Sequence, residues 1–161
     1  MKTIPYRRKR EGKTDYKKRL SLLKSNKLRL VVRTSNKHTL LQLAQYTPKG
    51  DEIVVSASTA ELAKLGWTTS TSNLPAAYLA GFLLAKKAKV KESVPDIGMH
   101  ASVKGARIYA ALKGCKDGGL IFSLDASVAP PEERITGKHT KSKADITTMK
   151  KKIEETTWQK K

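Results

Sequence analysis

The stretch LRLVVRTSNKHTLLQLAQYTPKGDEIVVSA, residues 28–57, decides the fold. Its runs of apolar and β-branched residues at 28–33, 38–46 and 52–57 are typical of β-strands. Residues 33–38 make the first turn, and residues 47–51, which include a proline and a glycine, make the second. Three strands joined by connections this short predict an antiparallel meander. We expect the two arginines of the first strand, Arg29 and Arg33, to point outward.

Beyond these strands the apolar residues change to helical spacing. Ser72 or Asn73 can cap a helix that runs from Leu74 to Ala85, with Pro75 in its first turn. Residues 94–99 predict another strand, residues 104–113 a second helix ended by Gly114, and residues 118–122 a short last strand. The order βββαβαβ predicts an α/β sandwich in which the three-strand meander extends to a mixed sheet with packed helices.

Both ends of the chain add a helix to this body. Thr14 is the expected N-cap of a short amphipathic helix over residues 15–24, and Asp145 is the expected cap of a polar helix over residues 146–158. We therefore divide the chain into three parts. We expect residues 1–27 to form a basic arm with a short helix, residues 28–125 to form the α/β core, and residues 126–161 to form a basic C-terminal extension with a terminal helix.

Charge is unevenly distributed along the 161 residues. The chain carries 33 Lys and Arg against 14 Asp and Glu, which gives a formal net charge of +19. Residues 1–37 contain 14 basic and 2 acidic side chains, residues 38–100 contain 6 and 5, and residues 101–161 contain 13 and 7. A folded protein this charged repels itself unless a polyanion neutralises it. We therefore expect a nearly neutral body whose basic ends face nucleic acid.

Membrane insertion and secretion are not expected. The longest near-apolar stretch, residues 74–85, is much shorter than the roughly 20 residues that a bilayer requires. No apolar segment follows the basic N-terminus, so a signal peptide is not expected either. The single cysteine, Cys115, allows no internal disulfide and is interpreted as a small buried hydrophobe. A reducing cytoplasm is the compartment that fits these features.

Residues for catalysis or metal binding do not form a usable pattern. The three histidines, His38, His100 and His139, lie far apart and lack metal-ligand spacing. Three of the candidate carboxylates lie in turns, where Asp is common for backbone reasons. These candidates are Asp51, Asp96, Asp117 and Asp125. The Gly-rich segment 114–119 lacks the ending of a phosphate-binding P-loop. The sequence therefore predicts no enzyme, no cofactor and no small-molecule substrate.

Two segments carry the residue types that bind RNA. In the arm, arginines and lysines bind phosphates, and tyrosines offer rings for base stacking. The arm candidates are Tyr6, Arg7, Arg8, Lys9, Arg10, Tyr16, Lys17 and Arg19. The turn after the first strand offers cations, hydroxyls, an amide and an imidazole. Its candidates are Arg33, Thr34, Ser35, Asn36, Lys37 and His38. A nuclear-localisation or solubilising tail and an ordinary hairpin turn are the alternative interpretations.

Several sequence blocks, in order from residue 6 to about residue 140, resemble a known family. The most specific are YRRKREGKTDY at 6–16 with RLSLLKS at 19–25, and RLVVRTSNKH at 29–38. Further blocks are GW at 66–67, NLPAAYLAG at 73–81, DIG at 96–98 and RITGKH at 134–139. Together they resemble the archaeal and eukaryotic form of the 5S rRNA-binding large-subunit ribosomal protein, the universal ribosomal protein L-eighteen family.

The resemblance implies a structural, non-catalytic role on the ribosome. The protein would bind 5S rRNA, help attach it to the central protuberance, and meet 23S-type rRNA and neighbouring large-subunit proteins. The resemblance assigns RNA contacts to the arm, to the region 29–38, which includes Arg29, and to Lys138 and His139. It also implies a ribonuclease-H-like α/β topology. We expect the arm to be disordered before RNA arrives, because so charged a segment buries little by itself.

Two other classes of protein remain as alternatives at this point. A sequence-nonspecific DNA-binding or chromosome-compacting protein shares the charge, but the sequence shows no recognition helix or dimer motif. An RNA-processing nuclease on the same fold requires a cluster of carboxylates for divalent metals. Binding without metal and without cleavage excludes the nuclease.

Overall fold

The computed structural model describes residues 3–90, 92–137 and 145–156, and its centre is a four-stranded sheet in the order β3-β2-β1-β4. The strands are β1 (Leu28–Thr34), β2 (Thr39–Thr47), β3 (Gly50–Ser58) and β4 (Ser93–Asp96). β2 pairs antiparallel with both β1 and β3, whereas β4 runs parallel to β1 at the edge of the sheet. The chain is therefore α/β with a mixed sheet, and the three strands of residues 28–57 are confirmed.

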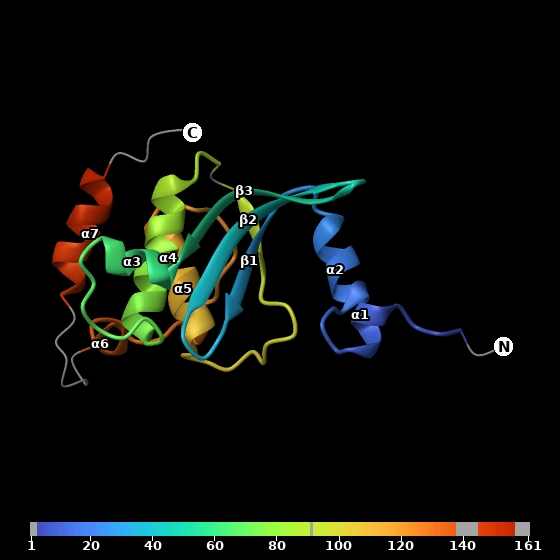
Figure 1. The fold of residues 1–161 in the computed structure, drawn as a ribbon, viewed down its shortest axis with the longest axis horizontal. Helices are drawn as coiled ribbons and strands as arrows, with labels where there is room; N and C mark the ends of the chain where they lie inside the picture. Colours follow the sequence, from blue (N-terminus) through green and yellow to red (C-terminus); the bar gives the residue numbers. More distant parts are fainter. Residues whose placement is uncertain (1–2, 91, 138–144, 157–161) are drawn as a thin grey trace.

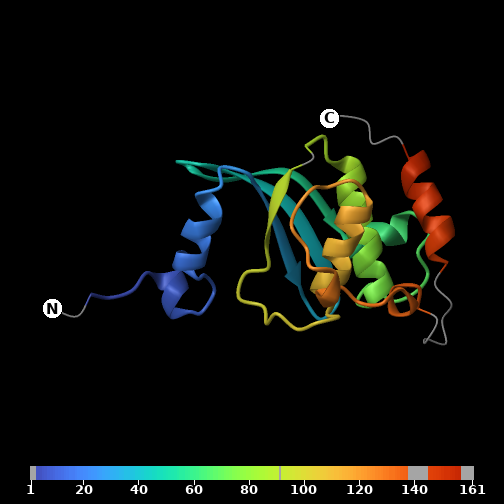
Figure 2. The same ribbon diagram turned by 180° about the vertical axis from the view of Figure 1, so that it is seen from behind.

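One face of the sheet is buried beneath helices. Leu30 and Val32 of β1 and Leu41 of β2 are fully buried, and Leu43 is 1% exposed. Helix α4 (Leu74–Lys87) contacts β2 and β3, helix α5 (Arg107–Asp117) packs against α4 and contacts β1, and α7 (Ile146–Glu155) packs on α4. Figures 1 and 2 show α4 and α5 on one side of the sheet and α7 farther out on the same side.

The helix ends follow capping chemistry. The side-chain oxygen of Asn73 accepts from the Ala76 N–H at the start of α4, and the carboxylate of Asp145 accepts from the Thr148 N–H at the start of α7. Both caps lie where the sequence placed them. The predicted cap at Thr14 is wrong by one residue, because Asp15 instead accepts hydrogen bonds from two backbone N–H groups of α2 (Tyr16–Leu23).

The expected end of the second helix at Gly114 is also wrong, because α5 continues to Asp117. A Cβ atom at Gly114 would lie 2.0 Å from the Tyr78 carbonyl oxygen, and one at Gly81 would lie 2.0 Å from the Ala111 carbonyl oxygen. The two glycines thus let the backbones of α4 and α5 touch at their crossing. The sequence reasoning took Gly114 for a helix terminator, whereas its role is close packing.

Three further predictions about elements need correction. The strand expected at 94–99 ends at Asp96, where the chain turns away, and the strand expected at 118–122 is reduced to one bridge between Glu92 and Ile121. The described order is therefore not βββαβαβ. Short helices that were not predicted are α3 (Thr59–Lys64), η1 (Ala126–Val128) and α6 (Glu132–Ile135). The terminal helix is described as far as Glu155, and Trp158 lies outside the described residues.

The hydrophobic core extends well beyond the sheet. It includes Trp67 after α3, Cys115 in α5, Ile135 in α6 and Ile153 in α7. Cys115 is fully buried, and this burial raises the pKa of its thiol, so the residue is an inert core side chain. Within the described ranges, no helix combines the length and hydropathy needed to span a membrane.

The arm lies at the far end of the molecule from these helices (Figures 1 and 2). It consists of α1 (Arg7–Arg10) and α2, and neither helix contains a buried residue. Leu20, one of the residues expected on an apolar face, is 59% exposed. The segment that we expected to be disordered is thus helical in the structure, although apolar burial does not hold it in place.

Candidate nucleic-acid interface

The arm is organised by local polar contacts. In α1, Arg7 and Lys13 both form ion pairs with Glu11, at 2.8 Å each. Hydrogen bonds from Lys13 and Arg7 lower the pKa of Glu11, so this carboxylate stays ionised. The Nε of Arg8 donates to the Thr14 hydroxyl at 2.9 Å. These bonds fold residues 7–14 into a compact loop that precedes α2.

Two tyrosines meet on this loop. The rings of Tyr6 and Tyr16 lie 5.3 Å apart between centroids with an interplanar angle of 51°. They are 74% and 37% exposed, respectively. An exposed aromatic pair is a surface on which an unpaired base can stack. The structure thus brings together the two rings that the sequence had suggested separately.

Arg7 and Arg8 are held by contacts within the arm, and the other arginine and lysine candidates that the structure describes fall into two groups. The first group consists of exposed side chains that have no ion-pair or hydrogen-bond partner among the described residues 3–90, 92–137 and 145–156. Its members are Lys9, Arg10, Lys17 and Lys37. The second group has carboxylate partners on the sheet, namely Arg19, Arg29 and Arg33. Only the first group is free to bind phosphate without first breaking a contact within the protein.

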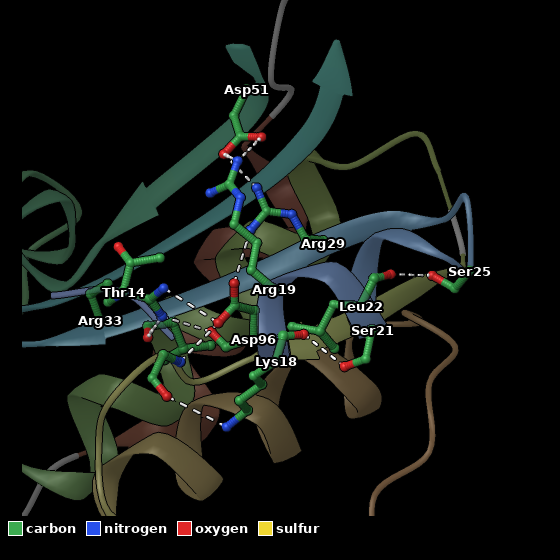
Figure 3. A network of polar contacts seen from close by, with 12 residues as sticks. Thr14, Lys18, Arg19, Ser21, Leu22, Ser25, Arg29, Arg33, Asp51 and Asp96 are labelled. Atoms are coloured by element: carbon green, nitrogen blue, oxygen red, sulfur yellow. Dashed lines mark hydrogen bonds and ion pairs between the residues drawn. The ribbon is translucent and has the colours of Figure 1, made fainter. Parts of the chain in front are cut away.

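Arg29 is the main departure from the sequence analysis. It is 3% exposed, and its guanidinium contacts Asp96 at 2.9 Å and Asp51 at 2.5 Å. Asp51 also accepts two hydrogen bonds from Arg19 of α2, at 2.9 and 2.8 Å. Figure 3 shows Arg19 and Arg29 converging on Asp51. The expectation that Arg29 points into solvent is wrong, because two acidic residues from distant parts of the chain cover it.

Arg33 is half-exposed and holds the end of β4. One of its Nη atoms donates to the Asp96 carbonyl at 2.8 Å, and the other lies 3.3 Å from the Asp96 carboxylate. That carboxylate also accepts from the backbone N–H of Gly98 at 2.8 Å. A Cβ atom at Gly98 would lie 2.7 Å from the Arg33 guanidinium carbon, so the guanidinium packs on bare backbone. Lys18 of α2 reaches the Gly98 carbonyl at 3.4 Å.

A small cleft of about 90 Å³ lies where the arm meets the sheet. Six basic and two acidic side chains line it, so its charge suits an anion. They are Arg8, Lys13, Lys18, Arg19, Arg29 and Arg33, with Asp15 and Asp96. Sequence reasoning missed Lys13, Lys18 and Asp96 as parts of this cleft, and it missed Asp51 as the partner of two of its arginines. The lysines were visible as members of the basic run, whereas Asp51 and Asp96 are brought close to the arginines only by the fold.

The turn Ser35–His38 forms a second polar surface. The Ser35 N–H donates to the His38 carbonyl at 2.8 Å, and the His38 N–H donates to the Ser35 hydroxyl at 3.0 Å. The predicted turn is therefore confirmed, and all four side chains are exposed. Before the turn, the Thr34 N–H donates to His100 at 3.4 Å. The close packing of this turn leaves the side chains of Asn36, Lys37 and His38 to face outward.

The structure does not bring the arm and this turn together. The arm adjoins the start of β1 and the turn follows its end, as Figure 1 shows. β1 has seven residues, so the two surfaces lie about 20 Å apart at ~3.3 Å per residue. The loop after β4 runs between them, with Gly98 contacting the arm and His100 contacting Thr34. Two further candidates, Lys138 and His139, lie outside the described residues.

No group of three His, Cys, Asp or Glu side chains positioned to hold a metal occurs in the part of the chain that the structure describes. Asp51 and Asp96 both form ion pairs with Arg29.

Two comparisons relate this chain to known ribosomal proteins. A family model described as "Ribosomal large subunit proteins 60S L5, and 50S L18" matches residues 2–94. The large ribosomal subunit protein uL18 of Korarchaeum cryptofilum (strain OPF8) is 48% identical over 145 residues, which cover 88% of this chain and 74% of that protein. The chain therefore belongs to the L18 family of large-subunit ribosomal proteins, which are structural, rRNA-binding and non-enzymatic components of the ribosome.

Proposed function

We propose that this protein binds 5S rRNA and helps attach it to the central protuberance of the large ribosomal subunit. The observation that carries the proposal is the arm, whose unpaired cations and exposed tyrosine pair lie at one end of the molecule. Partners of the same assembly are 23S-type rRNA and neighbouring large-subunit proteins, on a cytoplasmic ribosome.

The proposed contacts divide by chemistry. The unpaired cations Lys9, Arg10 and Lys17 bind phosphates, which supplies most of the affinity and makes it sensitive to salt. Tyr6 and Tyr16 stack on an unpaired base, which supplies selectivity for folded RNA with exposed bases. The turn at 35–38 makes a second contact about 20 Å away, so the protein follows one RNA surface along β1. Lys138 and His139 belong to the same proposed interface.

We also propose that the sheet belongs to the ribonuclease-H-like class. The order β3-β2-β1-β4 with β4 parallel to β1 supports this topology, and the parallel bridge between Glu92 and Ile121 lies where a fifth strand would extend the sheet. Such a fold hosts nucleases elsewhere, but fold alone does not determine function.

A salt titration tests the function. The full chain is titrated with 5S rRNA, with scrambled RNA of the same length and with duplex DNA, from low to near-physiological salt. All three should weaken as salt rises, because each binding reaction releases counterions. We expect 5S rRNA to keep an advantage of about a hundredfold, or ~3 kcal/mol, near physiological salt. Three superimposed curves would mean a nonspecific polyanion binder and would contradict the proposal.

A further inference from the structure

An acidic residue lies in the middle of this basic interface. Asp51 is the second residue of β3, at the tip of the β2–β3 hairpin beside α2. Its side chain is 26% exposed and touches Arg19 of the arm and Arg29 of the sheet at the same time. Burial raises the pKa of Asp51, but hydrogen bonds from Arg29 and Arg19 outweigh this effect and lower the pKa overall. The residue is therefore a carboxylate at neutral pH.

A β-bulge puts the carboxylate on the side of the arm. In an undistorted strand Asp51 would share a face with Ala57, which is fully buried beneath the helices. The register between β2 and β3 skips Val54, so the residues before it change face. Asp51 then pairs with Tyr46 and lies on the same face of the sheet as Arg29.

The arm has little else to hold it on the sheet. No residue of α2 is buried, and Leu20 on its surface is 59% exposed. Apart from the Asp51 contacts, the hydrogen bond between α2 and the body that the described residues show is the 3.4 Å contact from Lys18 to Gly98. Leu22 and Leu23 are only partly buried, so the contacts of Arg19 and Arg29 with Asp51 are the shortest polar contacts that join α2 to the sheet.

Considered only as a charge, the carboxylate of Asp51 is unfavourable for binding a polyanion. Each carboxylate on a polyanion-binding surface weakens binding, and removing one raises the net charge by one unit. Asp51 partly neutralises the buried Arg29, and by also binding Arg19 it orders a cation of the arm that would otherwise be mobile. Pre-ordering a binding segment raises affinity because less conformational entropy is lost on association.

We propose that Asp51 is a positioning residue for RNA binding, which fixes the arm helix on the sheet by bridging Arg19 and Arg29. It does not touch RNA itself. The inference rests on the proposed function, because its binding readout uses 5S rRNA. The proposal predicts that neutralising Asp51 weakens binding to RNA, whereas removing a negative charge ordinarily strengthens binding to a polyanion.

The test compares Asp51→Asn with Glu52→Gln in the full chain. Both variants change the net charge equally. Glu52 is the adjacent acid, and it is a suitable control because it is exposed and has no ion-pair partner within the described ranges. We expect Asp51→Asn to bind 5S rRNA about tenfold more weakly at fixed salt. Glu52→Gln should bind as well as the wild type or slightly more tightly. Asp51→Glu, which keeps the charge, should restore most of the affinity.

A readout without RNA separates this inference from the proposed function. The ¹⁵N heteronuclear NOE of residues 16–23 reports the order of α2 in the free protein. It should fall in Asp51→Asn and stay unchanged in Glu52→Gln, whether or not 5S rRNA is the preferred ligand. Fluorescence of the buried Trp67 checks that the sheet and helices remain folded. A normal NOE together with 5S affinity equal to that of Glu52→Gln would overturn the proposal.

A second variant covers the case in which Asp51→Asn fails to fold. Arg19→Gln removes the arm side of the bridge and leaves the pairing of Arg29 with both carboxylates intact. Its matched control is Lys24→Gln, which loses the same charge from the exposed C-cap residue of the same helix and is not among the proposed RNA contacts. Arg19→Gln should lower both the NOE of α2 and the 5S affinity more than Lys24→Gln does. Equal effects would mean that Arg19 acts only as a charge and would overturn the bridge.

Discussion

At the scale of single residues, arginines of the same basic region differ in their burial and in their partners. Arg10 is exposed and unpaired within the described part of the chain, whereas Arg29 is 3% exposed and joins two carboxylates. Alternation along β1 predicted the face of Arg29 correctly, opposite to Leu30. It did not predict burial, because the covering groups, Asp51 and Asp96, are 22 and 67 residues away in sequence. Local periodicity contains no information about such contacts.

This difference predicts opposite phenotypes for two Arg-to-Ala substitutions. Arg29→Ala leaves two partly buried carboxylates without their main partner and should lower the free energy of unfolding by about 3 kcal/mol. Arg10→Ala should change it by less than about 0.5 kcal/mol, while weakening RNA binding. Urea unfolding followed by Trp67 fluorescence measures the first quantity, and RNA binding at fixed salt measures the second. Equal stability of the two variants would show that the buried pairing contributes little.

At the scale of elements, the sequence predicted what local chemistry controls. The three strands of 28–57 and the caps at Asn73 and Asp145 were found because periodicity and side-chain oxygens act within a few residues. Helix α3 was missed although Ser58 and Glu61 form a capping box, a signal that the sequence does contain. The bulge at Val54 was not predictable in this way, because it depends on pairing between strands.

The crossing of α4 and α5 yields a prediction at the same scale. In an exposed helix interior, Gly→Ala stabilises by roughly 1 kcal/mol. At Gly114 the added Cβ would meet the Tyr78 carbonyl oxygen at 2.0 Å, so the helices must separate. We expect Gly114→Ala to destabilise the protein by about 1–3 kcal/mol, as overpacked cores do. Thermal unfolding by circular dichroism measures this, with Lys116→Ala on the exposed side of α5 as the control. A gain in stability for Gly114→Ala would contradict the close approach.

At the scale of the whole molecule, sequence position and spatial position of charge coincide. The arm carries the densest positive charge and lies at one end of the long axis, and α7 lies at the other (Figure 1). The sequence therefore predicted at which end of the molecule the densest positive charge lies, and we propose that this end faces RNA. It did not predict which cations are already paired, because that depends on the acids that the fold brings near them. The number of cations free to bind phosphate is smaller than the basic residues of the arm suggest.

The salt dependence of binding measures that number. Each phosphate contact contributes about 0.7 to 0.9 to the slope of log K against log salt. The triple variant Lys9→Gln, Arg10→Gln and Lys17→Gln removes three unpaired cations of the arm. It should make the slope of log K against log salt less steep by about 2. The matched control changes three exposed lysines on the helical side, Lys64, Lys116 and Lys151, to Gln with the same loss of charge. Its slope should stay within about 0.5 of the wild type, because those lysines lie on α3, α5 and α7, away from the arm. Equal reductions in the two triple variants would mean that RNA responds to net charge alone, in which case the arm is not the binding surface.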